Sequence, residues 1–246
     1  MEIDQKDVDA LIREKYHGNS HADLKEDLKR LAEGEPLAYV IGNVPFLGLS
    51  LDLSSRPLIP RVETEWWTEK LIAHLGDRRL RVLDLCAGSG AIGLALLKHC
   101  PNIHVSFGEL VEEHAKLIRK NLELNGLDAT RADIRTGNLF APFSGERFDL
   151  IASNPPYIPQ GRPLPESVEA FEPHEALFSG TDGLTLIRQI AKEASGYLSP
   201  SGEVWMECDS ENIAEAEKLL HEGGALRTEI QSDQYGRSRF VVAFYS

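Results

Sequence analysis

The sequence predicts an α/β fold in which a doubly wound, mostly parallel sheet follows a short helical module and a β-hairpin. Two observations carry this prediction. Short apolar segments of strand length alternate with segments whose apolar residues recur at helical spacing. A glycine-rich turn also follows the first of these apolar segments, as in nucleotide-binding sheets. The 246 residues, 42% of them hydrophobic, suffice for one well-buried domain and a small appendage.

The N-terminal part of the chain predicts a helical hairpin over residues 4–33. Apolar residues recur at helical spacing on both sides of a polar break, namely Val8, Leu11, Ile12, Leu24, Leu28 and Leu31. Residues 37–60 mix β-branched and aromatic residues with glycine turns, which predicts a β-hairpin, and helical spacing resumes over 63–75. We therefore expect three parts: a short helical docking module (1–36), a hairpin linker (37–61) and a catalytic domain (62–246).

The remaining chain alternates between the two kinds of element. Strands are expected at 80–85, 103–107, 148–152, 203–207, 226–230 and 239–244. Helices are expected at 92–98, 112–125, 184–197 and 212–222. Such alternation indicates a parallel sheet with helices on both faces. Because ligands bind such sheets beyond the carboxyl ends of the strands, the residues that follow each strand are the candidates for a site.

Composition and charge narrow the class of protein. Acidic residues outnumber basic ones 39 to 26, and the net charge of −13 disfavours a nucleic acid partner and fits a basic protein better. Cys86, Cys100 and Cys208 lie far apart without metal-ligand spacing, so we expect neither a metal site nor disulfides. The charged N-terminus lacks the apolar core of a signal peptide, and no segment approaches the ~20 apolar residues of a membrane span. We expect a cytoplasmic protein.

A glycine-rich loop follows the first strand of the expected sheet. Its candidate cofactor-binding residues are Asp84, Cys86, Ala87, Gly88, Ser89 and Gly90. The two glycines allow a sharp turn and a close approach of the backbone to a ligand at a helix N-terminus. The spacing Gly88-x-Gly90-x-x-Gly93 matches a dinucleotide fingerprint, but an acid at position 84 is unfavourable beside a pyrophosphate. The acid suits a cationic cofactor, and Asp-x-x-x-Gly-x-Gly is the pattern of enzymes that bind S-adenosylmethionine.

A second acid supports the same cofactor. Glu109 follows the second expected strand, roughly twenty residues beyond the glycine loop, where a carboxylate can accept hydrogen bonds from both ribose hydroxyls. A surface glutamate at the start of a helix would explain this residue equally well if it stood alone. Strand, acid and spacing coincide here, so we assign Glu109 to the ribose of the cofactor.

The candidate catalytic residues are Asn154, Pro155, Pro156 and Tyr157, which follow the strand expected at 148–152. Two prolines fix the backbone and leave the carbonyl groups of Asn154 and Pro155 rigidly exposed. An amide or exocyclic amine is a poor nucleophile because its lone pair is delocalised. Two acceptors, the Asn154 side-chain oxygen and the Pro155 carbonyl, would hold such a nitrogen toward a methyl donor, and Tyr157 would add an aromatic face. The corner predicts methylation of a planar nitrogen.

With these residues identified, the chain resembles the HemK/PrmC family of protein-(glutamine-N5) methyltransferases, which have a Rossmann-like class I methyltransferase fold. The matching segments run in family order: GEPLAYVIGNVPFLGLSLDLSSRPLIPRVETE (34–65), VLDLCAGSGAIGLAL (82–96), GNLF (137–140), FDLIASNPPYIP (148–159), FEPHEALFSGTDGL (171–184) and DQYGRSRFVV (233–242). The resemblance implies methylation of the glutamine in the Gly-Gly-Gln motif of class I peptide-chain release factors. The segment LIPRVETE is closer to the release-factor branch than to the ribosomal-protein branch.

The resemblance also implies a role for each matching position. Residues 86–90 form the cofactor loop, Glu109 binds the ribose, Asn154 contacts the cofactor as well as the substrate, and residues 154–157 bind the glutamine. Asn138 takes the place next to the adenine that is usually an aspartate, and its amide can still pair with the adenine edge. Leu139 stands where some members have an aromatic residue, which predicts weaker stacking on the adenine. Glu109 replaces a more frequent aspartate.

The choice of protein substrate stays open at this point. Residues 1–33 precede the GEPLAY segment. Members of the HemK/PrmC family, which the chain resembles, usually have a longer helical domain there that binds the release factor. An N6-adenine methyltransferase acting on DNA or RNA is the alternative, since it uses the same kind of Asn-Pro-Pro-Tyr corner, but the net charge and the lack of a Lys/Arg-rich stretch oppose it. A non-catalytic module would be expected to lack Asn154 or the glycine loop, and both are present.

Overall fold

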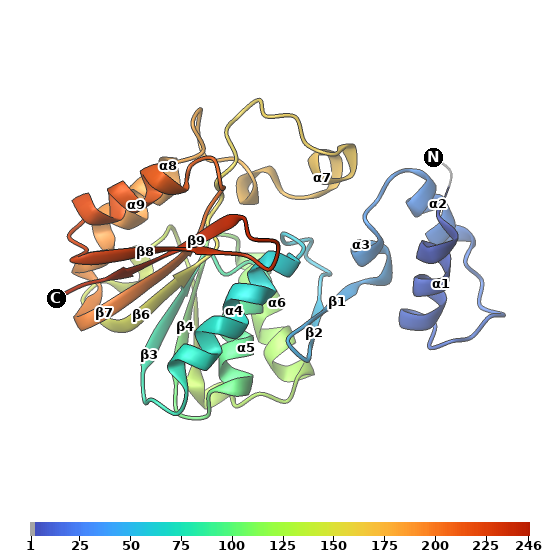
Figure 1. Ribbon diagram of the computed structural model, residues 1–246. Helices are drawn as coiled ribbons and strands as arrows, with labels where there is room; N and C mark the ends of the chain where they lie inside the picture. The colour runs from blue at the N-terminus through green and yellow to red at the C-terminus, as the bar shows by residue number, and fades with distance from the viewer. Residues whose placement is uncertain (1–2) are drawn as a thin grey trace.

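The computed structural model describes residues 3–246 and begins with three helices: α1 (Gln5–Glu14), α2 (Lys25–Ala32) and α3 (Leu37–Ile41). Asp4 caps α1 by accepting a hydrogen bond from the backbone N–H of Lys6. The three helices share a small apolar cluster of their own, which includes Leu11, Leu31 and Val40. The predicted helical hairpin is therefore confirmed, and Figure 1 shows it at the opposite end of the molecule from the C-terminus.

The prediction that residues 37–60 form a β-hairpin is wrong at its start. Leu37–Ile41 is a helix for two reasons. The ring of Pro36 fixes the φ angle of the residue before the first turn, and the apolar residues 40 and 41 pack onto the first two helices. The helix ends at Gly42, whose φ of 95° suits glycine. The hairpin itself is β1 (Asn43–Phe46) and β2 (Leu49–Asp52). Leu47 and Gly48 connect them with positive φ angles of 44° and 76°, as a tight two-residue turn requires.

Across residues 3–246, the main sheet has seven strands: β3 (Arg81–Leu85), β4 (His104–Glu109), β5 (Ala132–Thr136), β6 (Phe148–Ser153), β7 (Leu198–Glu207), β8 (Arg227–Ser232) and β9 (Ser238–Phe244). Their spatial order is β5-β4-β3-β6-β7-β9-β8. The pairs from β5 to β7 are parallel, and β9 is antiparallel to both of its neighbours. The prediction of a doubly wound, mostly parallel sheet is confirmed. The sequence did not reveal β5.

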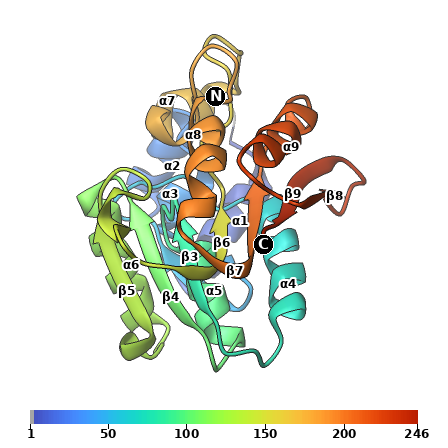
Figure 2. The same cartoon turned by 90° about the vertical axis from the view of Figure 1, so that its left-hand side faces the viewer.

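Helices cover both faces of this sheet (Figures 1 and 2). One face carries α4 (Val62–Leu75), α5 (Ala91–His99) and α6 (Glu112–Leu124), and the other carries α8 (Thr185–Glu193) and α9 (Ile213–Glu222). The chain also forms the short helix α7 (Glu166–Phe171) and single turns at η1 (Ala129–Arg131), η2 (Ala141–Phe143), η3 (His174–Ala176) and η4 (Ala194–Gly196). Successive residues of a strand point to opposite faces of the sheet, and each face has its own apolar core. Val82 packs with α4 to α6 on one face, and Leu83 packs with α8 and α9 on the other. The five predicted helices over residues 63–222 are confirmed.

The chain order creates a switch point at β3. From β3 the chain moves outward through β4 to β5, and then returns to place β6 on the other side of β3. Leu85 lies opposite Gly108 in β4 and opposite Ser153 in β6, so these three strands end at the same edge. Ligand sites of doubly wound sheets lie at such a point. The glycine loop, Glu109 and the Asn-Pro-Pro-Tyr corner therefore meet at this edge.

Gly93 secures the contact between α5 and the sheet. A Cβ atom at this position would lie 2.3 Å from the ring of Phe107 and 2.9 Å from the carboxylate of Asp84. We expect Gly93→Ala to lower the free energy of unfolding by about 1–3 kcal/mol, because a buried helix would have to move away from the strands. Gly196→Ala is the matched control, since a Cβ there meets nothing within 4 Å. Urea denaturation measures both, and equal stability of the two variants would contradict this account.

Candidate functional site

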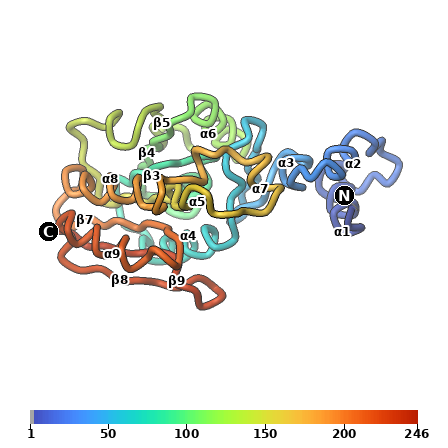
Figure 3. Tube along the Cα trace, turned by 90° about the horizontal axis from the view of Figure 1, so that it is seen from above, coloured from blue at the N-terminus to red at the C-terminus, as the bar shows by residue number. Residues whose placement is uncertain are grey.

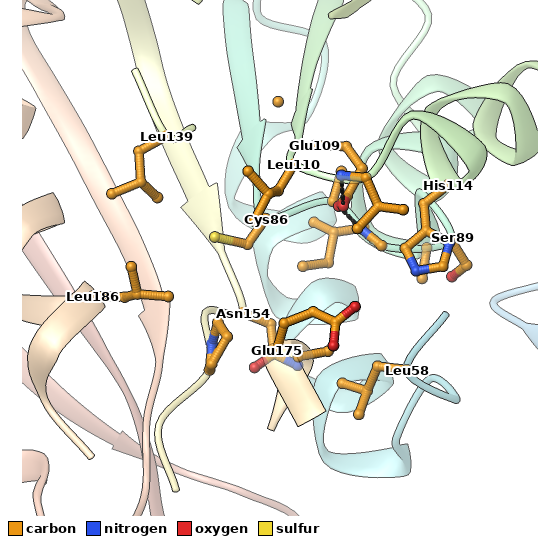
Figure 4. Close-up of a pocket in the computed structure, with 18 of the residues that line it drawn as sticks. Leu58, Cys86, Ser89, Glu109, Leu110, His114, Leu139, Asn154, Glu175 and Leu186 are labelled. Carbon is orange, nitrogen blue, oxygen red and sulfur yellow. Dashed lines mark hydrogen bonds between the residues drawn. The ribbon is translucent and has the colours of Figure 1, made fainter. Parts of the chain in front are cut away.

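A pocket opens at the carboxyl edge of β3, β4 and β6, and most of the predicted site residues line it. These are Cys86, Ala87, Gly88, Ser89, Glu109, Asn138, Leu139, Asn154 and Pro156. Figure 4 shows Leu139 and Leu186 on one side of the pocket and His114 and Leu58 on the other. The structure thus brings together three segments, the glycine loop, the end of β4 and the proline corner, that are far apart in the sequence.

Backbone hydrogen bonds hold the glycine loop against β4. The N–H groups of Cys86 and Ala87 donate to the carbonyl of Gly108, at 3.0 and 3.1 Å. Gly88 and Gly90 have φ angles of 55° and 81°, in the region that favours glycine, and Gly90 begins α5. Both glycines therefore serve the turn that the sequence predicts. Gly90 does not line the pocket, and a Cβ atom at this position would meet Ile118 and Leu94.

Glu109 joins the loop to the start of α6. One carboxylate oxygen accepts a hydrogen bond from the N–H of Gly88 at 2.7 Å, and the other accepts one from the N–H of Val111 at 2.9 Å (Figure 4). The side chain is 6% exposed. Each carboxylate oxygen can accept a further hydrogen bond, so Glu109 can organise the loop and still bind a ligand's hydroxyl groups.

Asp84 does not reach the pocket. Its side chain is fully buried between β3 and α5, where Oδ2 accepts a hydrogen bond from the N–H of Gly93 at 2.8 Å. Among the described residues, Oδ1 has no hydrogen-bond partner. Burial raises the pKa of Asp84 to about 8, and the nearby Glu109 adds to this rise while the Gly93 hydrogen bond opposes it. The structure therefore gives Asp84 a place behind the loop, where it positions α5.

This pKa predicts how stability depends on pH. The folded state keeps a proton on Asp84 that the unfolded state releases near pH 4, so the contribution of Asp84 to stability is lost as pH rises toward about 8. We expect Asp84→Asn, which keeps the shape without the charge, to lack this loss. The unfolding free energy of the variant relative to the native chain should rise by about 1 kcal/mol per pH unit between pH 5 and 8. Parallel stability profiles would show that Asp84 is not protonated in the fold.

The proline corner is only partly in the pocket wall. Asn154 and Pro156 line the pocket, whereas Pro155 and Tyr157 do not. The Asn154 Nδ2 group donates to the Thr64 hydroxyl at 3.2 Å, and the Tyr157 hydroxyl donates to Glu207 at 3.0 Å. Burial and the Glu207 carboxylate raise the pKa of Tyr157 well above its ordinary value, so its hydroxyl keeps its proton.

Several residues of the pocket wall were not predicted from the sequence: Leu58, Pro60, Thr64, Leu110, His114, Glu175 and Leu186. The sequence held a signal for most of them. Leu58, Pro60 and Thr64 belong to the matched segment 34–65 and Glu175 to the matched segment 171–184. Leu110 directly follows Glu109. His114 is nearly buried and its Nδ1 lies 2.8 Å from the Ser55 hydroxyl, which connects α6 to the loop after the hairpin.

The pocket can accept a cationic, nucleoside-like ligand. Glu109 and Glu175 give it negative charge, and apolar groups such as Leu110 and Leu139 can cover a planar ring. Burial raises the pKa of the Cys86 thiol to about 12, with Glu109 adding to the effect, so this group stays neutral and is not a nucleophile. Asn154 also lines the pocket and offers a side-chain oxygen that can accept a hydrogen bond.

Solved structures with a similar fold are methyltransferases. A methyltransferase from Pyrococcus furiosus has a TM-score of 0.61 at 17% identity, and the match covers 89% of this chain and 98% of that one. The Thermus thermophilus 16S rRNA N2 G1207 methyltransferase, solved with AdoMet and guanosine, has a TM-score of 0.59 at 21% identity, over 83% of this chain and 50% of that one. At these identities the likeness concerns the fold, and it confirms the predicted class I methyltransferase architecture.

Sequence relatives narrow the family. Residues 63–171 match the family model described as the methyltransferase small domain. The release factor glutamine methyltransferase of Streptococcus pneumoniae is 35% identical over 88% of this chain and 78% of its own length, and that of Deinococcus radiodurans is 36% identical over 89% and 77%. The resemblance drawn from the motifs is confirmed: the chain belongs to the release factor glutamine methyltransferase family.

Proposed function

We propose that this protein transfers the methyl group of S-adenosylmethionine to the side-chain amide nitrogen of a protein glutamine, in the Gly-Gly-Gln motif of class I peptide-chain release factors. The observation that carries the proposal is the meeting of Glu109, the glycine loop and Asn154 around one pocket at the switch point of the sheet. The family of the chain and the names of its relatives support the same substrate.

The pocket fits S-adenosylmethionine by the chemistry of its wall. Glu109 offers a free acceptor site on each carboxylate oxygen for the two ribose hydroxyls, and the exposed amide of Asn138 can pair with the adenine edge. Leu139 and Leu110 supply apolar surface for the ring, and the acidic wall suits a cation. When bound, the cofactor supplies an electrophilic methyl group on its sulfonium. The sulfur compound left after transfer is S-adenosylhomocysteine.

Asn154 is proposed to hold the target nitrogen. Its Nδ2 group is engaged by Thr64, and among residues 3–246 no hydrogen bond occupies its Oδ1 atom, which can accept one N–H of the glutamine amide. The Pro155 carbonyl, which is next along the corner, would accept the other N–H, although Pro155 itself does not line the pocket. Two acceptors on one NH₂ group fix its plane and favour pyramidalisation, so that the lone pair points at the methyl group. No strong base is needed, because the alkylated nitrogen becomes acidic and releases its proton to water.

We propose that the helices α1 to α3 are a docking module for the protein substrate. The module extends away from the catalytic domain in the view from above (Figure 3). The buried carboxylate of Glu35 joins it to the loop after the hairpin, by accepting hydrogen bonds from Arg30 at 2.7 and 2.8 Å and from Arg56. Residues 42–61 then form the linker and residues 62–246 the catalytic domain.

The location of the protein follows from the proposed substrate. None of the helices in the described part of the chain is long and apolar enough to cross a membrane. Action on a release factor would place the protein in the cytoplasm.

A labelling experiment tests the substrate. The protein is incubated with methyl-labelled S-adenosylmethionine and, in separate reactions, with a release factor carrying Gly-Gly-Gln, with its Gln-to-Ala variant, and with an adenine-containing duplex. We expect label only in the intact release factor. Equal labelling of the Gln-to-Ala variant overturns the proposed glutamine, and labelling of the duplex supports the N6-adenine alternative, which the net charge of −13 disfavours.

A further inference from the structure

A buried carboxylate lies directly behind the proline corner. Glu207, at the end of β7, is 1% exposed and does not line the pocket. Three groups donate hydrogen bonds to it: the Thr64 hydroxyl at 2.6 Å, the Trp67 indole N–H at 2.7 Å and the Tyr157 hydroxyl at 3.0 Å. The Trp67 indole can only donate, and both hydroxyls donate in this arrangement, so a carboxylate that only accepts satisfies all three groups.

The direction of these hydrogen bonds extends to Asn154. A hydroxyl has one proton, and Thr64 gives its proton to Glu207. Toward Asn154 the Thr64 oxygen can therefore only accept, and the amide must present Nδ2 to it, at 3.2 Å. The other end of the amide, Oδ1, is then left for the substrate. The chain of hydrogen bonds runs one way, from Asn154 through Thr64 to the carboxylate.

We infer that Glu207 is a positioning residue for methyl transfer: through Thr64 it sets which end of the Asn154 amide faces the substrate, and through Tyr157 it fixes the aromatic ring of the corner. This inference rests on the proposed function of Asn154 as the acceptor for the target nitrogen. Glu207 acts without contact to substrate or cofactor, because Thr64 and Tyr157 stand between them.

The environment of Glu207 holds the carboxylate in place behind the corner. Burial raises the pKa of Glu207, and the three donors and the nearby Arg239 oppose that rise. Thr64 and Trp67 both donate to Oε2, and Tyr157 donates to Oε1. Because an indole N–H can only donate, a glutamine here would keep its oxygen toward Trp67 and Thr64 and turn its NH₂ group to Tyr157. The Tyr157 hydroxyl would then have to accept, and the ring of the corner would lose the hydrogen bond that it donates to Glu207.

Two pairs of variants test the inference. Thr64→Val removes the hydroxyl and keeps the shape, and Thr64→Ser restores the hydroxyl. Glu207→Gln removes the charge, and Glu203→Gln on the same strand is its control, because Glu203 pairs with His74 and Trp205 outside the pocket wall. We expect Thr64→Val and Glu207→Gln to lower kcat about tenfold to a hundredfold, as misplacement of a reacting group does. The Kd for S-adenosylmethionine should change less than about threefold, and Thr64→Ser should recover most of the lost kcat.

The side-chain amide signal of Asn154 in nitrogen-edited NMR spectra reports its hydrogen bonding directly, without the substrate. It should shift in Thr64→Val, where the partner of Nδ2 is lost, and stay near its native position in Thr64→Ser and Glu203→Gln. An unchanged signal and kcat in Thr64→Val overturn the inference even if Glu207→Gln fails to fold. If the native protein does not methylate the Gly-Gly-Gln substrate while the amide signal responds as expected, the proposed function fails, and only the orientation of the Asn154 amide by Thr64 stands.

Discussion

Asn154→Ala is expected to lower kcat for glutamine methylation by about 10²- to 10³-fold, the loss that follows removal of a preorganised hydrogen-bond partner at a reacting centre. The substitution removes the side-chain oxygen that would hold the target nitrogen, and it leaves Glu109 and the glycine loop in place. We therefore expect cofactor affinity to be largely retained. Single-turnover kinetics with saturating S-adenosylmethionine, together with calorimetric titration of the cofactor, separate the two effects.

Asn102→Ala is the matched control for this variant. Asn102 is an exposed asparagine whose side chain donates to the backbone carbonyl of Asp77, away from the pocket. It should leave kcat near the native value. Near-normal turnover of Asn154→Ala would contradict the proposed mechanism, since the corner would then orient the amide without its asparagine.

Glu109→Ala is expected to weaken S-adenosylmethionine binding by about 10²- to 10⁴-fold. Hydrogen bonds to a charged group contribute about 1.5–3 kcal/mol each, and two ribose hydroxyls lose their acceptor. The N–H groups of Gly88 and Val111 also lose theirs, which loosens the loop. Calorimetric titration measures the Kd, and kcat at saturating cofactor should fall much less than in Asn154→Ala.

Glu112→Ala provides the comparison for charge alone. Glu112 is an exposed acid at the start of α6, and it pairs with Lys116 on the same helix. Its loss should change the Kd less than about twofold, because exposed ion pairs contribute little. If both variants bind the cofactor equally well, Glu109 does not hold the ribose.

The fold could be predicted wherever the apolar pattern was strong. The buried strand of residues 148–153 is apolar along most of its length, and both of its faces are covered by helices. Strand β5 at the sheet edge reads Ala-Asp-Ile-Arg-Thr and is mostly half-exposed, so its sequence has no such pattern. Helix α3 was missed because its run of β-branched and aromatic residues favours a strand, and only its packing onto α1 and α2 makes it helical.

The parts of the site that are formed by short, continuous segments of the chain could be predicted. The residues at and just after the carboxyl ends of β3, β4 and β6 share an edge in any doubly wound sheet, so the shared location of Gly88, Glu109 and Asn154 was predictable. Asp84 was not, because a residue inside a strand points to a face of the sheet and its acid faces α5. Contacts such as that between Thr64 and Glu207 join residues from distant elements and depend on how α4 packs. No local pattern marks them.

The central claim is that a glutamine side-chain amide receives the methyl group, and mass spectrometry of the modified substrate tests it most directly. A release factor incubated with the protein and S-adenosylmethionine is digested, and the peptide containing Gly-Gly-Gln is fragmented. We predict a mass increase of one methylene unit that fragmentation assigns to the glutamine residue in the native reaction, and little of it with Asn154→Ala in the same reaction time. A methyl group on any other residue of the peptide, or an unmodified peptide under conditions where the cofactor binds, would contradict the account.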